Sequence, residues 1–189
     1  YTKYGVKEIA FEDDNLTANY KRSEDIFNGL IDRKIKLKWN TPNGTAVHNI
    51  DKKLVKLMKR SGCNRLQFGI ESGNDYILHT VMNKNMSLEK VREVINLVHK
   101  EGIVTNGYFV LGMPGETVKS IEDSYNFATS LPLDEIGLQL AVPYPGTQLE
   151  KMSRENGWLK VDARSLIAED GAGGVVFIVT SSMSASLLV

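Results

Sequence analysis

The sequence predicts an α/β fold in which parallel strands alternate with helices. Short apolar segments, most with the two-residue period of strands, recur at residues 6–11, 35–39, 66–70, 108–111 and 136–142. Between them lie four segments with apolar residues at helical spacing. Such alternation indicates parallel strands joined by right-handed crossovers, hence a barrel or an open doubly wound sheet. A complete eight-fold barrel needs about 250 residues, so a chain of 189 residues indicates an incomplete barrel or a fragment of one.

Polar capping residues and glycines mark the helix boundaries. Ser23, Asp51 and Ser87 are expected to cap the first three helices, because their side-chain oxygens can accept the unpaired N–H groups of a helix start. Gly62 and Gly102 are expected to end the second and third helices. The fourth helix is expected to bury an apolar face made of Val118, Ile121, Tyr125 and Ala128.

Composition excludes several function classes. The 23 basic and 23 acidic side chains cancel, which argues against a nucleic-acid surface, because phosphate binding needs concentrated positive charge. One cysteine and three scattered histidines form neither an internal disulfide nor a convincing metal site. The sequence carries no secretory signal, and the apolar run 175–179 is far shorter than the roughly 20 residues of a membrane span. A globular cytoplasmic protein is expected, with one core over residues 1–158 and an extension over 159–189 that can add an edge strand.

Polar residues follow each predicted strand at its carboxyl end. They are Glu12, Asp13 and Asp14 after the first strand, Asn40 and Asn43 after the second, Glu71 and Ser72 after the third, Glu116 after the fourth and Tyr144 after the fifth. Ligands bind at this edge in barrels and in doubly wound sheets, so the pattern predicts a polar pocket. For any single residue, ordinary loop polarity is an equal alternative. Glu71 differs from the others because it directly continues an alternating apolar strand.

Five strings in order along the chain resemble the radical S-adenosylmethionine (SAM) superfamily. They are Phe11-Glu-Asp-Asp-Asn15, Gly62-Cys63, Phe68-Gly-Ile-Glu-Ser-Gly73, Gly107-Tyr-Phe-Val-Leu-Gly-Met-Pro-Gly-Glu-Thr117 and Pro143-Tyr-Pro-Gly-Thr147. The match runs from Val6 to about Trp158. It looks most like the branch that often carries an upstream cobalamin-binding domain, which includes radical methyltransferases and anaerobic magnesium-protoporphyrin monomethyl ester cyclases.

The resemblance implies a partial TIM-type (β/α)6 barrel that binds SAM beside a [4Fe–4S] cluster. Such enzymes cleave SAM reductively to a 5′-deoxyadenosyl radical, here for methyl transfer or oxidative cyclisation at a C–H position. The family's cluster ligands form a Cys-x-x-x-Cys-x-x-Cys loop after the first strand of the barrel, and no such loop occurs in this sequence. The expectation is therefore that the chain holds strands two to six, that the cluster ligands lie upstream of Tyr1, and that the chain alone is inactive. No metal ligand and no catalytic residue is assigned within it.

The same resemblance implies SAM-binding roles for residues at four strand ends. Those expected near the SAM ammonium are Glu12, Asp13 and Asp14. Those expected at the ribose are Glu71 and Ser72. Those expected behind the adenine are Phe109, Leu111 and Gly112, with Glu116 orienting their turn. Those expected where the last strand approaches the adenine are Ala141, Pro143 and Tyr144. For Glu116 the role of an ordinary helix-start acid is at least as well supported, and Pro143 can equally be a turn residue.

Partners follow from the resemblance as well. It implies a small- or medium-sized organic substrate, an electron donor such as ferredoxin or flavodoxin, and in some members cobalamin carried by a separate domain. Two alternatives stay open: a noncatalytic barrel without a cluster that binds SAM or another nucleoside, and an ordinary barrel enzyme that uses the rim carboxylates for acid–base chemistry.

Overall fold

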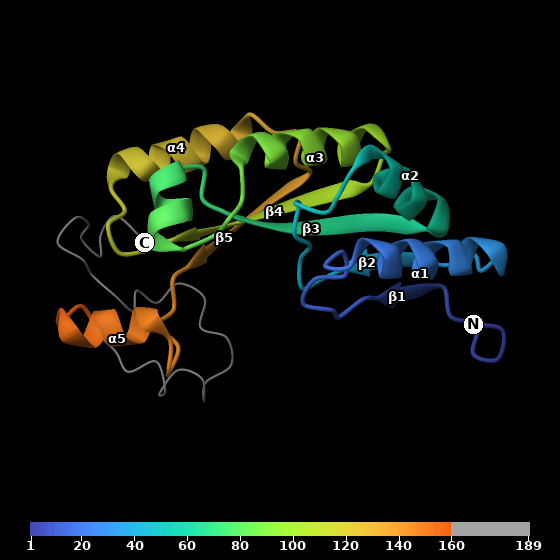
Figure 1. Ribbon diagram of the computed structural model, residues 1–189, viewed down its shortest axis with the longest axis horizontal. Helices are drawn as coiled ribbons and strands as arrows, with labels where there is room; N and C mark the ends of the chain where they lie inside the picture. The colour runs from blue at the N-terminus through green and yellow to red at the C-terminus, as the bar shows by residue number, and fades with distance from the viewer. Residues whose placement is uncertain (160–189) are drawn as a thin grey trace. The chain divides into compact units, whose positions relative to one another are not determined.

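A computed structural model describes residues 1–159 and confirms the α/β class (Figure 1). The helices and strands, in chain order, are β1 (Glu8–Ala10), α1 (Tyr20–Asp32), β2 (Lys38–Thr41), α2 (Lys52–Ser61), β3 (Cys63–Glu71), the π-helix η1 (Ile77–Val81), α3 (Leu88–Lys100), β4 (Val104–Leu111), α4 (Val118–Thr129), β5 (Glu135–Leu140) and α5 (Gln148–Glu155). The apolar run at 175–179 lies outside the described residues. Within the described part, no helix is long and apolar enough to cross a membrane.

The five strands form one sheet in the order β1-β2-β3-β4-β5. β1 pairs in parallel with β2, and β2 in parallel with β3. At the other end of the sheet, the Asp134 N–H donates to the Thr105 carbonyl at 2.9 Å and the Ala141 N–H to the Leu111 carbonyl at 2.7 Å. Residue numbers rise together on the two strands, so β4 and β5 also run in parallel. This sequential order is what right-handed strand–helix–strand crossovers produce.

Contacts divide the chain into two compact units. The first unit comprises Tyr1–Ile70, Met86–Tyr108 and Phe127–Gly137. The second comprises Glu71–Asn85, Phe109–Asn126 and the chain from Leu138 onward. The strand-end residues therefore fall into two groups, which are described separately below.

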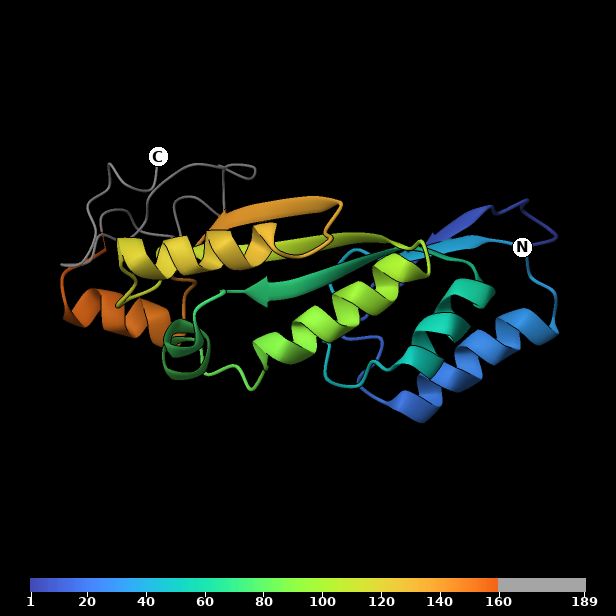
Figure 2. The same cartoon turned by 90° about the horizontal axis from the view of Figure 1, so that it is seen from above.

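A buried tryptophan organises the core of the first unit. Trp39 on β2 is fully buried and stacks on Phe27 of α1, with ring centroids 4.9 Å apart, while Phe11 meets it edge-on at 5.4 Å. Its indole N–H donates to the Ser61 hydroxyl at 3.0 Å, which ties the end of α2 to the same point. α2 packs between α1 and α3, and Figure 2 shows the three helices side by side along the sheet. Removing a buried ring of this size costs about 3–5 kcal/mol. Trp39 is therefore a main anchor of β2 and of its neighbour β1, which Glu12 to Asp14 follow in the chain.

The predicted helix caps are confirmed except for the first. Asp51 accepts from the Leu54 N–H at 2.7 Å, and Ser87 accepts from the Lys90 N–H at 3.3 Å. The prediction for Ser23 is wrong, because Asn19 caps α1 and accepts from the Arg22 N–H at 2.9 Å. Ser23 is buried inside the first turn, where its hydroxyl donates to the Leu16 carbonyl at 2.9 Å. A buried carbonyl needs a donor, and Ser23 supplies it.

The predicted inner face of α4 is also partly wrong. Val118 and Tyr125 are 52% and 67% exposed. Ser120, Ser124 and Ala128 are the buried residues of the helix. These three lie four residues apart and are small, so the helix can approach its neighbours closely on that side.

Two helical elements were not predicted. One is the π-helix η1, which lies between β3 and α3. The other is α5, whose N-cap is Thr147; the Thr147 hydroxyl accepts from the Glu150 N–H at 3.2 Å. The Glu150 carboxylate in turn accepts from the Gly146 N–H at 2.8 Å. The signal for α5 was present in the sequence, because Thr-x-x-Glu is the spacing of a capping box.

Candidate functional site

Glu71 ends β3 in a strained backbone conformation. Its φ is +71°, in the left-handed region that costs a non-glycine residue about 1–2 kcal/mol. The side chain is only 18% exposed, and its carboxylate forms an ion pair with the Lys84 ammonium. Strain of this kind persists only where the surrounding structure enforces it, and it concentrates at functional sites.

The residues after Glu71 are fixed to α4 by hydrogen bonds that are buried or partly buried. The hydroxyls of Ser72 and Ser124 lie 3.1 Å apart, and the Gly73 N–H donates to Ser124 Oγ at 2.9 Å. Asn74 Nδ2 donates to Asp123 Oδ2 at 2.9 Å. Ser72 is fully buried, and its hydroxyl also accepts from the Asn74 N–H at 3.1 Å. Of the two predicted ribose contacts, Ser72 thus anchors the segment, while Glu71 presents a partly exposed carboxylate.

Lys84 is the residue that sequence reasoning missed. It follows η1, where the Met82 N–H reaches back to the Ile77 carbonyl at 2.9 Å. Asn83, which lies between Met82 and Lys84, has a φ of +52°. His79 Nδ1 lies 2.9 Å from the Lys84 carbonyl. π-Helical turns often occur at functional sites. The signal in the sequence was weak: asparagine tolerates the left-handed region better than most residues, but nothing in its position points to Glu71.

Glu116 closes the turn that follows β4. Its Oε2 accepts from the N–H groups of Gly112 at 2.6 Å and Met113 at 3.0 Å. The residue is fully buried, and Oε1 has no partner among residues 1–159. Burial raises the pKa of this carboxyl, although the two N–H bonds act in the opposite direction. Glu116 therefore fixes the backbone of the turn, which fits the predicted orienting role.

The ends of β4 and β5 meet in the second unit. The bond from the Ala141 N–H to the Leu111 carbonyl brings Ala141 next to the start of the Gly112 turn, where the φ of Gly112 is +87°. Ala141 is buried, whereas Tyr144 is 54% exposed. Phe109 is 1% exposed and belongs to the core, and Pro143 is buried as well. Leu111, Gly112 and Ala141 thus form one apolar corner, in which Gly112 and Ala141 are small.

The carboxylates after β1 belong to the first unit and differ from one another. Asp13 forms an ion pair with Arg22 at 2.7 Å. Glu12 and Asp14 are exposed, and neither carboxylate has a partner within the described part of the chain. The Glu12 carbonyl accepts from Asn43 Nδ2 at 2.9 Å, which joins the segment after β1 to the turn after β2. Asp13 is thus engaged, and Glu12 and Asp14 are the carboxylates that remain available to a cation.

The residues present do not fit an iron–sulfur cluster. Cys63 is the one cysteine of the sequence and is buried, with its Sγ 3.7 Å from the Arg65 carbonyl. Burial raises the pKa of this thiol, which opposes the thiolate that a metal needs. Among residues 1–159 no three potential metal ligands gather. No catalytic step is therefore assigned to a cluster on this chain.

The sequential order of the strands is typical of a TIM-type barrel domain, and polar groups lie at their carboxyl ends. The chain belongs to the radical SAM superfamily, whose family model matches residues 1–128. This finding confirms the resemblance that the strand-end motifs indicated.

Individual relatives agree with the superfamily. An uncharacterized methyltransferase of Pyrococcus horikoshii is 33% identical over 83% of this chain and 34% of its own length. An anaerobic magnesium-protoporphyrin IX monomethyl ester cyclase of Cereibacter sphaeroides is 26% identical over 81% of this chain and 25% of its own length. The chain thus spans about a third or less of these relatives.

The fold matches a solved structure. The radical SAM methyltransferase TsrM from Kitasatospora setae, solved with cobalamin and a [4Fe–4S] cluster bound, aligns with a TM-score of 0.71 at 16% identity, over 85% of this chain and 31% of that one. At this identity the match supports the fold alone.

Proposed function

We propose that this chain binds SAM at the carboxyl ends of its strands, as part of a radical SAM core that functionalises a C–H bond by methyl transfer or oxidative cyclisation. The observation that carries the proposal is Glu71, a carboxylate held in a strained conformation at the end of a parallel strand. In this superfamily a [4Fe–4S] cluster supplies the electron that cleaves SAM to a 5′-deoxyadenosyl radical. This chain lacks ligands for that cluster, so its own contribution is to bind and orient SAM.

The ribose hydroxyls of SAM need acceptors, and Glu71 provides one. A hydrogen bond to a charged group contributes about 1.5–3 kcal/mol. Lys84 fixes the direction of the Glu71 carboxylate, because the two groups form an ion pair. Ser124 acts as a positioning residue, since it holds the backbone that follows Glu71.

The adenine needs a flat apolar surface. Leu111 offers an apolar side chain there, Gly112 and Ala141 leave room for a ring, and Glu116 holds the turn in place. The SAM ammonium needs a carboxylate, and Glu12 and Asp14 are the candidates, because Asp13 is already paired with Arg22.

The substrate and partners belong to the proposal as well. Relatives named as methyltransferases and cyclases support a small- or medium-sized organic substrate. The resemblance to the cobalamin-associated branch implies a cobalamin-dependent methyl transfer, with the cobalamin on a separate domain. The electron donor is expected to be a ferredoxin or a flavodoxin.

The test uses the intact natural protein that contains this sequence. It is purified without oxygen, supplied with iron, sulfide, dithionite and SAM, and assayed for 5′-deoxyadenosine. We expect 5′-deoxyadenosine from the wild type and much less from Glu71→Gln at a SAM concentration below saturation. SAM binding without 5′-deoxyadenosine would support the noncatalytic alternative, and absence of SAM binding would refute the proposal.

A further inference from the structure

Helix α2 carries a concentrated positive charge on its exposed face. Its ten residues include five cations and no acidic residue. The cations, all exposed, are Lys52, Lys53, Lys56, Lys59 and Arg60. Leu54, Val55, Leu57 and Met58 are buried on the opposite side. In a chain with no net charge, this face is a local excess of positive charge.

Two of these cations are engaged within the protein. Lys53 forms an ion pair with Glu24 of α1 at 2.6 Å. Lys59 Nζ donates to the Gly102 carbonyl at 2.6 Å, just beyond α3. These contacts join α2 to its two neighbouring helices, so Lys53 and Lys59 have a structural role.

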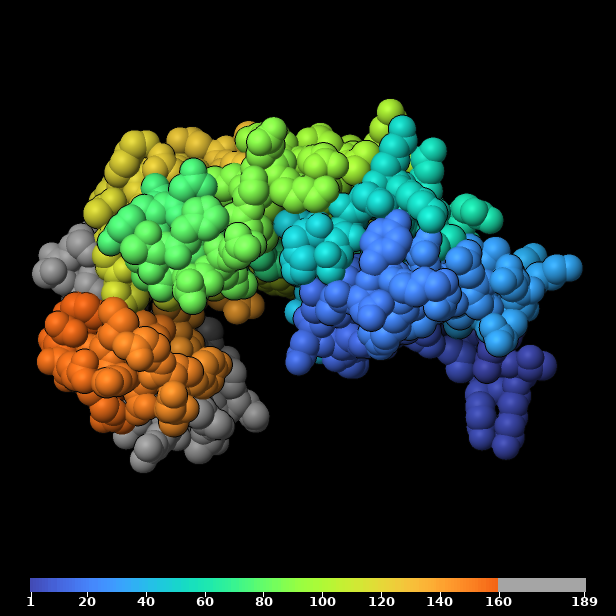
Figure 3. Space-filling model, in the orientation of Figure 1, coloured from blue at the N-terminus to red at the C-terminus, as the bar shows by residue number. Residues whose placement is uncertain are grey.

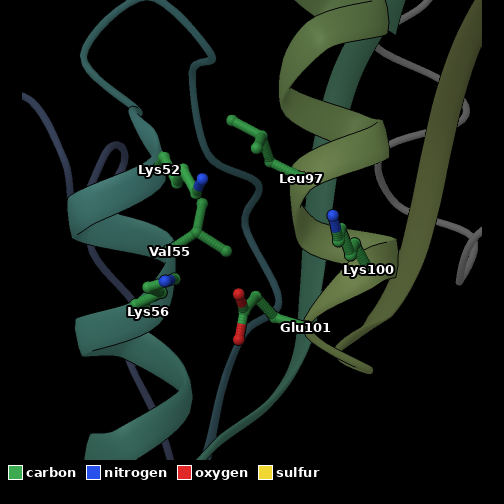
Figure 4. Close-up of a pocket in the computed structure, with 6 residues that line it drawn as sticks. All are labelled: Lys52, Val55, Lys56, Leu97, Lys100 and Glu101. Atoms are coloured by element: carbon green, nitrogen blue, oxygen red, sulfur yellow. The ribbon is translucent and has the colours of Figure 1, made fainter.

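Three other lysines surround a hollow between α2 and α3 (Figure 4). The hollow has a volume of about 180 Å³, and its lining residues are Lys52, Val55, Lys56, Leu97, Lys100 and Glu101. Within the described range no carboxylate lies within 4.0 Å of the Lys52, Lys56 or Lys100 ammonium groups, so even Glu101 forms no ion pair with them. Val55 and Leu97 give the hollow an apolar floor. Figure 3 shows α1 and α2 at the surface of the molecule.

The size and chemistry of the hollow indicate a protein partner. Binding pockets for small molecules measure about 300–1,000 Å³, so this hollow fits a side chain better than a nucleotide or a cofactor. Its lining contains no aromatic residue on which a base could stack. Lysines around an apolar floor match a segment that combines carboxylates with an apolar side chain.

We infer that the exposed face of α2, together with Lys100, docks an acidic segment of a partner protein. Carboxylates of that segment meet Lys52, Lys56 and Lys100, and one of its apolar side chains enters the hollow over Val55 and Leu97. This docking surface is distinct from the strand ends and does not depend on the proposed SAM binding.

The test measures fluorescence anisotropy of a short labelled peptide, made of glutamates with leucines spaced one helical turn apart, at low salt. We expect the chain to bind it, and binding to weaken at least tenfold in the variant Lys52→Glu/Lys56→Glu/Lys100→Glu. A matched control, Lys7→Glu/Lys34→Glu/Lys36→Glu, makes the same charge change elsewhere and should bind as the wild type does. Alanine at positions 52, 56 and 100 gives a milder variant, should charge reversal unfold the protein.

Three outcomes would overturn the inference. The first is that the wild type does not bind the peptide. The second is that both triple variants lose binding equally, which would indicate a response to net charge alone. The third is that a single-stranded oligonucleotide of equal charge binds more tightly than the peptide, which would indicate a nucleic-acid partner.

Discussion

Replacing Glu71 with glycine should weaken SAM binding while it leaves the stability of the protein nearly unchanged. The left-handed backbone at Glu71 costs about 1–2 kcal/mol, which glycine relieves. Against this gain stand about 0.5–1 kcal/mol for the greater freedom of glycine in the unfolded chain and about 0.2–1 kcal/mol for the lost ion pair with Lys84. The terms nearly cancel, so the free energy of unfolding should change by no more than about 1 kcal/mol, or roughly 4 °C in Tm for a chain of this size.

SAM affinity should respond quite differently. Loss of a charged acceptor for the ribose hydroxyls removes about 1.5–3 kcal/mol, which corresponds to a roughly tenfold to hundredfold weaker Kd. Isothermal titration of SAM into the intact natural protein measures the affinity, and thermal unfolding measures the stability. Lys34→Gly is the matched control, because Lys34 also has a positive φ (+54°) and lies at the end of α1; its SAM affinity should not change. If Glu71→Gly binds SAM as tightly as the wild type does, the assignment of Glu71 to the pocket is wrong.

Four further predictions follow from the structure. Ser124→Ala removes the buried acceptor of the Gly73 N–H and should lower stability by about 1–3 kcal/mol; an unchanged Tm would contradict the anchoring role. Gly62→Ala places a Cβ atom 2.1 Å from the Leu37 carbonyl oxygen at a φ of +107°, so a cost on the order of 3 kcal/mol or more is expected, and wild-type denaturant unfolding would refute it. Folding raises the pKa of Glu116, so its ionisation destabilises the folded protein as pH rises through the folded pKa. Urea titrations should therefore show that the stability of the wild type relative to Glu116→Gln is greatest in acid and falls toward neutral pH. A difference that does not depend on pH would contradict this prediction. The 189-residue chain, reconstituted anaerobically with iron and sulfide, should show no stable [4Fe–4S] absorbance, and a stoichiometric cluster that responds to SAM would contradict the missing ligand set.

Local signals in the sequence predicted most of the fold. The alternating residues of β3 and the caps at Asp51 and Ser87 are confirmed, because each depends on neighbours within a few positions. The prediction for Ser23 failed because Asn19, four residues earlier, caps α1, so that Ser23 lies inside the helix, where its hydroxyl donates to the Leu16 carbonyl. The inner face of α4 was missed because close packing there selects small residues such as Ser124 rather than apolar ones.

The candidate site was predictable only in part. The sequence motifs singled out Glu71 and Glu116, and the structure adds how each is held. The partner of Glu71, Lys84, could not be predicted, because a π-helix and a left-handed asparagine bring it back to the strand end. The ion pair between Asp13 and Arg22 could not be predicted either, since both residues look like ordinary surface charges in the sequence.

Amide NMR of the 189-residue chain during a SAM titration tests the central claim most directly, because chemical shifts detect even millimolar binding and locate it by residue. We predict that the shifts concentrate at Glu71, at the turn of residues 111–116 and at Ala141, and that 5′-deoxyadenosine perturbs the same amides. Shifts confined to other surfaces, or no shifts at millimolar SAM, would contradict the claim that these strand ends form a SAM-binding site.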